Sequence, residues 1–253
     1  MGCLNKLAGC IGTIIIILAI IAAILYFWLV PQLSGKIEDG LRKKLMLGPS
    51  ATVEIQDTGI IAMSQGRIEK VVVDAPEARV NDYVVKNLKF DAEGLKFDLI
   101  KTAFMGDPVI DTLGEGELSF DVPADTLASV WKESASKIGV SDFKLTLSPK
   151  DSEVGLEGKW KISWLNKEFP FSAKAKLSVR GGSLIFFEIP EIQVGDLKVG
   201  LDRLKDGISK ISPRIDLGDY KVKLDINDIS ITNSGIHIEA HAEEAEAESS
   251  NSK

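Results

Sequence analysis

Residues 11–30 of the chain are Ile-Gly-Thr-Ile-Ile-Ile-Ile-Leu-Ala-Ile-Ile-Ala-Ala-Ile-Leu-Tyr-Phe-Trp-Leu-Val, without a charged side chain. As an α-helix this stretch would be about 30 Å long, which matches the hydrocarbon thickness of a bilayer. Aromatic residues at 26–28 suit the headgroup level, and Pro31 interrupts any helical continuation. The stretch therefore predicts a transmembrane anchor over residues 11–30. The rest of the chain is then expected to form a domain attached to this anchor.

The anchor is expected to be retained, because its apolar run is longer than that of a cleaved signal and no small-residue cleavage site follows it. Only Lys6 precedes the span, whereas a cluster of cations follows it, and charge alone would place the C-terminal side in the cytoplasm. Long domains cross membranes largely regardless of charge, however. We therefore expect residues 1–10 to form a cytoplasmic stub and the large C-terminal domain to be extracytoplasmic.

Composition excludes several classes of function. The 253 residues carry a net charge of −7, so there is no basic excess that would favour nucleic acid as a partner. Both cysteines, Cys3 and Cys10, precede the span, and the domain therefore has neither a disulfide nor a thiol nucleophile. The Ala/Glu/Ser-rich residues 241–253 have no apolar periodicity and predict a disordered acidic tail.

Directly after the anchor, Leu33, Ile37, Leu41 and Leu45 recur every four residues and predict an amphipathic helix. Its apolar stripe could pack on the domain or lie on the membrane surface. Its basic side chains could attract anionic headgroups at about 1 kcal/mol each, or they could form a solvated helix face. The candidate membrane-surface residues are Lys36, Arg42, Lys43 and Lys44.

From Thr52 onward the hydrophobic period changes to two, which is typical of strands with one buried face. About ten such strands follow, with turns expected at residues 93–94, 114–115, 181–182 and 233–235. Helical stripes interrupt them at about 123–138 and at 197–211. The fold class is therefore α+β: a large curved, mostly antiparallel β-sheet packed on two or three amphipathic helices, over residues 31–240.

We find few residues or motifs in the sequence that would indicate catalysis or metal binding. His237 and His241 are the only histidines, and two ligands without cysteine support make a poor zinc site. Asp225, Asn227 and Asp228 lack the glycine and terminal glutamate of a calcium loop. The chain has no nucleophile elbow, P-loop or dinucleotide-binding glycine pattern. We therefore expect no enzyme activity, no metal and no cofactor.

Apolar surface remains as the candidate functional feature. The aromatic and aliphatic residues of the second half of the domain could pack into a closed core, or they could line a groove that accepts acyl chains. Sequence alone leaves both possibilities open. The candidate lipid-binding residues are Trp131, Trp160, Trp164, Phe171, Phe186, Leu201, Leu204 and Ile208.

Beyond the anchor and the amphipathic helix, a series of segments carries a family resemblance. These segments are Val-Glu-Ile-Gln-Asp (53–57), Gly-Arg-Ile-Glu-Lys-Val-Val-Val (66–73), Gly-Leu-Lys-Phe-Asp (94–98) and Val-Pro-Ala-Asp-Thr-Leu (122–127). In pattern and element order the chain resembles the LmeA-like family of bacterial cell-envelope proteins over residues 34–240. The resemblance implies an extracytoplasmic domain that binds membrane phospholipid, is related in shape to tubular lipid-binding proteins, and helps to maintain envelope lipids.

This resemblance implies no catalytic residues, and it places the anchor in the bacterial cytoplasmic membrane as a single-pass span. Many members have a cleavable signal, whereas this chain is expected to keep its anchor. The alternative is a non-enzymatic structural or interaction domain of the cell envelope, with a closed core and an unidentified envelope protein as its partner.

Overall fold

The computed structural model describes residues 35, 38–40, 42–43, 46–56, 59, 62–63, 65–98, 110–112, 114–162, 167–195, 197–200, 214–218 and 224–242. The described part of the chain contains no helix with the length and hydropathy of a membrane span. The predicted anchor (11–30) and stub (1–10) lie outside the described residues, as does all of the predicted tail after Ala242. Residues 35, 38–40 and 42–43 are helical, in the region where the amphipathic helix was predicted.

The described strands form two antiparallel sheets instead of the single large sheet expected from the sequence. The first sheet has the strand order β1-β2-β3-β5-β13-β12, with β4 paired to β3. Its strands are β1 (Thr52–Gln56), β2 (Arg67–Val80), β3 (Tyr83–Phe97), β4 (Ile110–Thr112), β5 (Glu115–Pro123), β12 (Leu224–Ile231) and β13 (Gly235–Ala242). The C-terminal hairpin β12-β13 therefore returns to the first sheet and pairs with β5.

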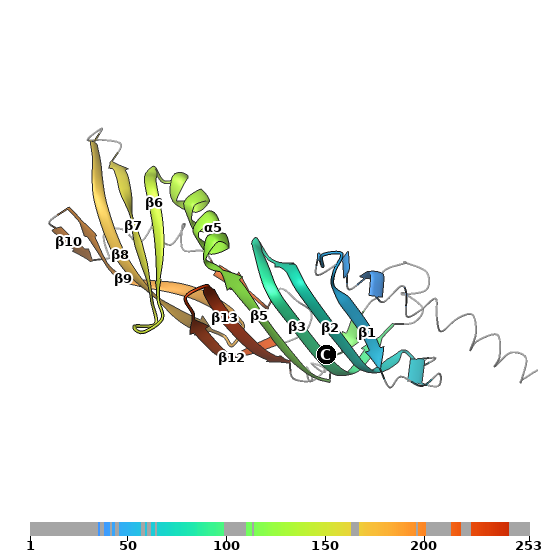
Figure 1. Ribbon diagram of the computed structural model, residues 1–253. Coiled ribbons are helices and arrows are strands. Elements are labelled where there is room, and N and C mark those ends of the chain that lie inside the picture. Colours follow the sequence, from blue (N-terminus) through green and yellow to red (C-terminus); the bar gives the residue numbers. More distant parts are fainter. Residues whose placement is uncertain are drawn as a thin grey trace, which may run out of the picture.

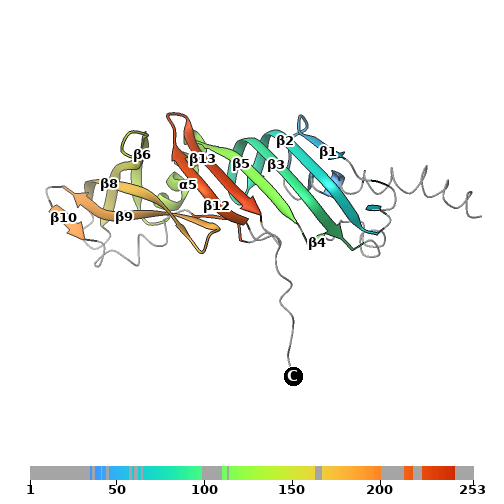
Figure 2. The same ribbon diagram turned by 90° about the horizontal axis from the view of Figure 1, so that it is seen from below.

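The second sheet has the order β10-β9-β8-β7-β6, with β11 paired to β9. Its strands are β6 (Val140–Ser148), β7 (Glu153–Ile162), β8 (Lys167–Arg180), β9 (Leu184–Val194), β10 (Leu197–Gly200) and β11 (Arg214–Asp216). In Figures 1 and 2 the two sheets follow one another along an elongated molecule. A strongly twisted sheet accommodates only a limited number of strands, which is a physical reason for the division.

Helix α5 (Ala124–Ser136) connects the two sheets, and the sequence predicted it. Pro123 is extended at its N-cap and Asp125 lies in the first turn, where a negative charge is favourable. Leu127, Trp131 and Ala135 recur every four residues and are buried. Figure 1 shows α5 at the boundary between β5 and β6. The helix therefore presents one apolar stripe to the place where the two sheets meet.

Two local predictions were wrong. Residues 197–200 form β10 instead of the start of a helix, because the turn at Gly195 (φ 57°) folds them back onto β9, with Leu197 opposite Val194. Gly94 does not end a strand either. It lies inside β3 at φ 67°, and the pairing of β2 with β3 keeps the same register on both sides of it, so the strand continues through the glycine.

Hydrogen bonds join the two sheets. The side-chain oxygen of Asn81, at the tip of the β2-β3 hairpin, accepts a 3.0 Å hydrogen bond from the backbone N–H of Asp216 in β11. The N–H of Ile226 in β12 donates to the carbonyl of Gly182 in the predicted β8-β9 turn, at 2.6 Å. Buried residues of both sheets and of α5 form one hydrophobic cluster. The described residues therefore share a continuous apolar interior.

Candidate functional site

The inner face of the first sheet is an apolar surface that runs across six strands. Cross-strand pairing aligns one row of side chains from β1 through β2, β3, β5 and β13 to β12: Val53, Val73, Phe90, Leu118, Ala240 and Ile226. Val73 and Ala240 are buried. The other four are half-buried and pack on the core. This row is therefore incompletely covered along its length.

The second sheet has a corresponding inner face. Leu145, Leu156, Ala173 and Ile192 are aligned across β6, β7, β8 and β9. Leu145 on the edge strand β6 is half-buried, while the other three are buried. Other half-buried apolar side chains pack on the same core. They are Phe143, Leu147, Phe171, Leu177 and Val194.

Trp131 of α5 contacts side chains from two strands of the second sheet that are not neighbours. Its ring lies edge-on to Phe187 of β9, with centroids 4.9 Å apart, and stacks on Phe143 of β6 at 6.2 Å. In the sheet, β7 and β8 separate these two strands. Side chains from strands three positions apart converge on one ring only if the sheet curls. The second sheet is therefore a curled half-barrel, and α5 lies along its apolar inner face.

A small hollow lies where the two sheets adjoin. Its volume is about 220 Å3, and β12 and β8 supply most of its lining, including Ile226, Ile229 and Leu177. Val179, also in the lining, is 39% exposed, and Met46 is the other large apolar side chain classed as exposed among the described residues. The apolar residues of the two inner faces thus meet next to an opening to solvent.

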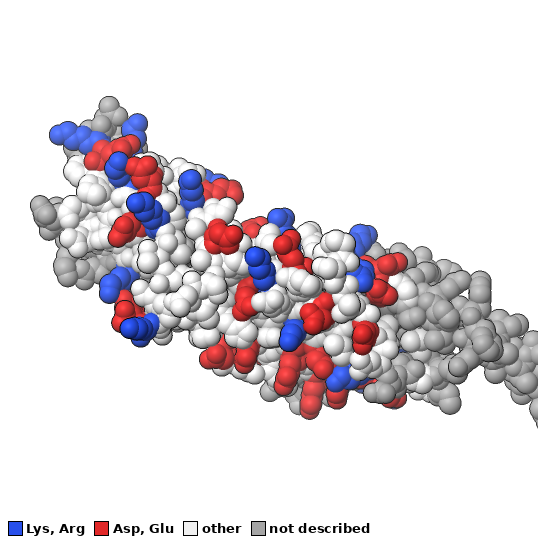
Figure 3. Space-filling model, viewed as in Figure 1, with Lys and Arg blue, Asp and Glu red and all other residues white. Residues whose placement is uncertain are grey.

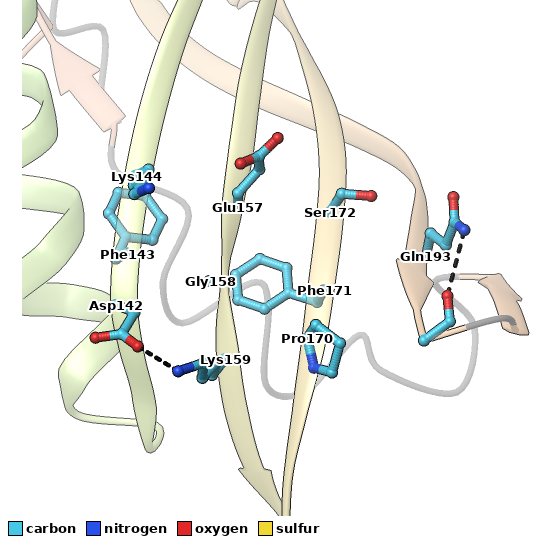
Figure 4. A pocket seen from close by; sticks show the side chains of 11 residues that line it. Asp142, Phe143, Lys144, Glu157, Gly158, Lys159, Pro170, Phe171, Ser172 and Gln193 are labelled. Carbon is cyan, nitrogen blue, oxygen red and sulfur yellow. Dashed lines mark hydrogen bonds and ion pairs between the residues drawn. The ribbon is translucent and has the colours of Figure 1, made fainter.

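A larger hollow of about 640 Å3 lies over β6 to β9 and has a mixed lining (Figure 4). Asp142 and Lys159 form an ion pair of 2.7 Å at one side. A hydrogen bond from Lys159 lowers the pKa of Asp142, and the same contact raises the pKa of Lys159. The ring of Phe171 lies over Gly158, where a Cβ atom would come within 2.8 Å of it. Gly158 therefore makes room for an aromatic ring on the inner face.

In the described strands, charged side chains lie on the outer faces of the sheets. Figure 3 shows acidic and basic side chains interspersed over the face in view. Cross-strand ion pairs include Lys70–Asp91 at 2.9 Å and Lys174–Glu153 at 2.8 Å. Among the residues whose burial the structure describes, no Lys, Arg, His, Asp or Glu side chain is buried. The interior of the described domain is therefore uncharged and suits an apolar guest.

The structure places the predicted lipid-binding residues in different environments. Trp131 is 3% exposed within the core, and Phe171 is half-buried on the inner face. Trp160 is half-buried, and its Nε1 donates to the carbonyl of Ile138 at 3.2 Å. Phe186 lies on the opposite face of β9 from Phe187, with the Arg180 guanidinium 3.9 Å above its ring. The other four predicted residues lie outside the described residues: Trp164, Leu201, Leu204 and Ile208.

The predicted membrane-surface residues are described only in part. Arg42 forms a 3.0 Å ion pair with Glu38 and donates a 2.7 Å hydrogen bond to the carbonyl of Ala51. Its guanidinium thus ties the helical segment to the start of β1. Lys43 is exposed. Lys36 and Lys44 lie outside the described residues.

One polar cluster on the outer face of the first sheet was not predicted. His237 of β13 contacts Asp121 of β5 through Nδ1 at 2.7 Å and Glu239 through Nε2 at 3.2 Å. Asn87 donates to the second oxygen of Asp121 at 2.7 Å. Only the cross-strand register brings these residues together. The described residues contain no group of three His, Cys, Asp or Glu side chains arranged to hold a metal.

The fold and its inner faces indicate a class of protein. A largely antiparallel β protein with a curled sheet, an uncharged interior and inner faces covered only in part is suited to hold apolar molecules. Residues 27–241 match the model of the LmeA-like phospholipid-binding family. The chain belongs to that family, which confirms the resemblance found in the sequence. Comparison with curated proteins and with solved structures gives no match.

Proposed function

We propose that this protein holds phospholipid with the acyl chains along the inner faces of its two sheets, while the anchor at residues 11–30 tethers it to a bacterial cytoplasmic membrane. Family membership supports phospholipid as the ligand. The observation that carries the proposal is the set of half-buried apolar side chains packed on the core, such as Phe90, Leu145 and Leu177. A guest would complete their burial.

The energy available from burial is sufficient without directed polar contacts. Each buried CH2 group contributes about 0.8 kcal/mol, so about ten of them contribute roughly 8 kcal/mol. Binding in the micromolar range requires about the same free energy. Burial of part of an acyl chain therefore opposes release of the lipid into water, and the cost of association reduces the net affinity. We assign the protein no catalytic step.

The proposed location follows from the sequence. We place the large domain that follows the apolar span outside the cytoplasm, because long domains cross membranes largely regardless of charge, and envelope phospholipid would there be within reach of the inner faces. The protein would then serve the maintenance of envelope lipids as a tethered holder. The competing function is a structural or interaction domain whose core needs no guest.

Native mass spectrometry of the full chain in detergent separates the two functions. After delipidation and incubation with palmitoyl-oleoyl phosphatidylglycerol, the protein should gain the mass of bound phospholipid. Leu145→Asp, which places a charge on the inner face of β6, should weaken binding at least tenfold, because the carboxylate is desolvated beside an acyl chain. Thr146→Asp, on the exposed face of the same strand, is the matched control and should bind normally. A protein that stays apo, or equal binding by both variants, would favour the competing function.

A further inference from the structure

Two strand edges border the small hollow where the sheets adjoin. Among the described strands, β12 is the last of the first sheet and pairs only with β13. The pairing of β7 with β8 ends at Glu153 and Lys176, so residues 177–180 of β8 extend beyond β7, while β9 pairs with them on the other side. Residues from both edges line the hollow of about 220 Å3. The two sheets therefore adjoin here along edges that no described strand covers.

A β-bulge interrupts the edge of β12 at this hollow. The pairing of β12 with β13 passes from Ile226 to Asp228 and leaves Asn227 as the bulged residue, which lines the hollow. Bulges bend a strand and are one of the features that prevent further pairing at a sheet edge. The N–H of Ile226 donates a 2.6 Å hydrogen bond to the carbonyl of Gly182, in the turn after β8. The two edges therefore lie near one another, but in the described sheets they are not neighbouring strands.

Side chains of the inner faces reach solvent through this hollow. Val179 is 39% exposed, although its cross-strand partner Ile185 in β9 is fully buried. Leu177 of β8 and Ile229 of β12 line the hollow and also pack on the hydrophobic core. The same side chains therefore border the hollow and the apolar interior. A nonpolar chain placed in the hollow would contact the inner faces of both sheets.

The lining of the hollow is apolar in one part and polar in another. Besides the apolar side chains, its lining includes Ser152, Ser178, Asn227 and Asp228. Ser178 alternates with its inward-facing neighbours along β8 and therefore points to the opposite face of the sheet. A ligand with a nonpolar part and a polar part would find contacts for both at this place. A phospholipid, the ligand class of the family, has an acyl chain and a headgroup that match this division.

We propose that the gap between residues 177–180 of β8 and residues 226–231 of β12 is a lateral opening through which an acyl chain passes between a membrane and the inner faces. This opening rests on the proposed function. The headgroup stays at the polar part of the lining, so its charge never has to lose its hydration in the apolar interior. Because uptake and release use the same path, closing the opening slows both by the same factor and leaves the affinity unchanged.

The test closes the opening with a covalent link. In the full chain with Cys3 and Cys10 replaced by serine, Ser178→Cys and Asn227→Cys are joined by a bismaleimide that contains a disulfide. The delipidated protein in detergent is then mixed with palmitoyl-oleoyl phosphatidylglycerol, and native mass spectrometry of samples taken over time measures the bound fraction. The link should slow loading about tenfold or more, because the two edges can no longer separate, and should leave the final bound fraction unchanged. Reduction of the disulfide in the reagent should restore the rate.

Ser172→Cys and Gln193→Cys, linked by the same reagent, are the matched control, because these exposed residues are already paired across β8 and β9. Their link should leave the loading rate unchanged. Val179→Asp, which needs no reagent, should also slow loading, because it places a carboxylate on the path of the acyl chain. Loading of the Ser178–Asn227 linked protein at the rate of the unlinked protein, or equal slowing by the control link, would overturn the opening while lipid binding stands. A protein that binds no phospholipid with or without a link would overturn the proposed function together with the opening.

Discussion

Gly158 controls the position of an aromatic ring on the inner face of the second sheet. An added Cβ would lie 2.8 Å from Phe171 Cε1 and 3.0 Å from the Ser141 carbonyl oxygen. Gly158→Ala should therefore lower the free energy of unfolding by about 1–3 kcal/mol, the usual cost of overpacking, in urea denaturation. A second substitution, Phe171→Leu, should recover part of the loss. Gly155→Ala in the same strand, where the nearest atoms are 3.6 Å away, should cost less; equal losses would contradict this packing.

His237 should make stability depend on pH. The hydrogen bond to Asp121 raises the pKa of His237. Burial raises the pKa of Asp121, but hydrogen bonds from Asn87 and His237 outweigh it and lower that pKa. The raised histidine contributes stability that is complete below its unfolded pKa of about 6.5 and is lost as pH rises through the folded value. The lowered carboxyl contributes stability above about pH 4 that is lost in more acidic solution.

The melting temperature of the unaltered protein should therefore exceed that of His237→Gln most at about pH 5–6, and the difference should shrink toward about pH 8. Both side chains are about one third exposed, so the effect is modest. His241→Gln, which leaves the Asp121 contact intact, is the control and should keep the pH dependence of the unaltered protein. A His237→Gln difference that grows with pH would show that the imidazolium does not stabilise this contact.

The contacts of several individual residues could not be predicted from the sequence. Alternation in the run Leu-Ile-Phe-Phe-Glu-Ile (184–189) does not reveal which phenylalanine faces inward, so Phe186 was selected and Phe187 was not. The cluster of Asp121 and His237 depends on the pairing of strands distant in the chain. The alternation of apolar and polar residues indicates which face of a strand is buried. Contacts between side chains of different strands depend on the register in which the strands pair.

At the scale of elements, α5 should contribute strongly to the curl of the second sheet. Trp131→Ala removes the ring that contacts both Phe143 and Phe187, and it should lower the free energy of unfolding by about 3–5 kcal/mol. Lys132→Ala, an exposed neighbour on the same helix, should change it by less than about 0.5 kcal/mol. Chemical denaturation monitored by far-UV circular dichroism measures both. Similar effects of the two substitutions would mean that the ring does not connect β6 and β9.

Most elements were predictable because their hydrophobic period is clear. Strands from Thr52 onward, α5 and the turns at Gly181-Gly182 and before Gly235 follow directly from the sequence. The division into two sheets did not, since pairing between distant strands leaves no local pattern. Leu197 and Leu201 have helical spacing, yet the hairpin at Gly195 puts Leu197 in β10. Pairing with a neighbouring strand outweighed local periodicity there.

At the scale of the whole molecule, the orientation in the membrane is open to a direct test. With Cys3 and Cys10 replaced by serine, a single cysteine at position 249 (Ser249→Cys) should react with a membrane-impermeant maleimide in intact cells, because we place the domain outside the cytoplasm. The same substitution should react to a similar extent after lysis. Protection in intact cells with labelling only after lysis would reverse the orientation.

The position of the acyl chains is the central claim, and photo-crosslinking tests it most directly. The full chain is loaded with phosphatidylglycerol that carries a diazirine midway along one acyl chain, irradiated, and digested for peptide mapping. The account predicts adducts on inner-face side chains such as Leu145, Phe171 and Leu177, and none on outward neighbours such as Ser172. Adducts confined to residues 11–30 or to the outer faces of the sheets would contradict it.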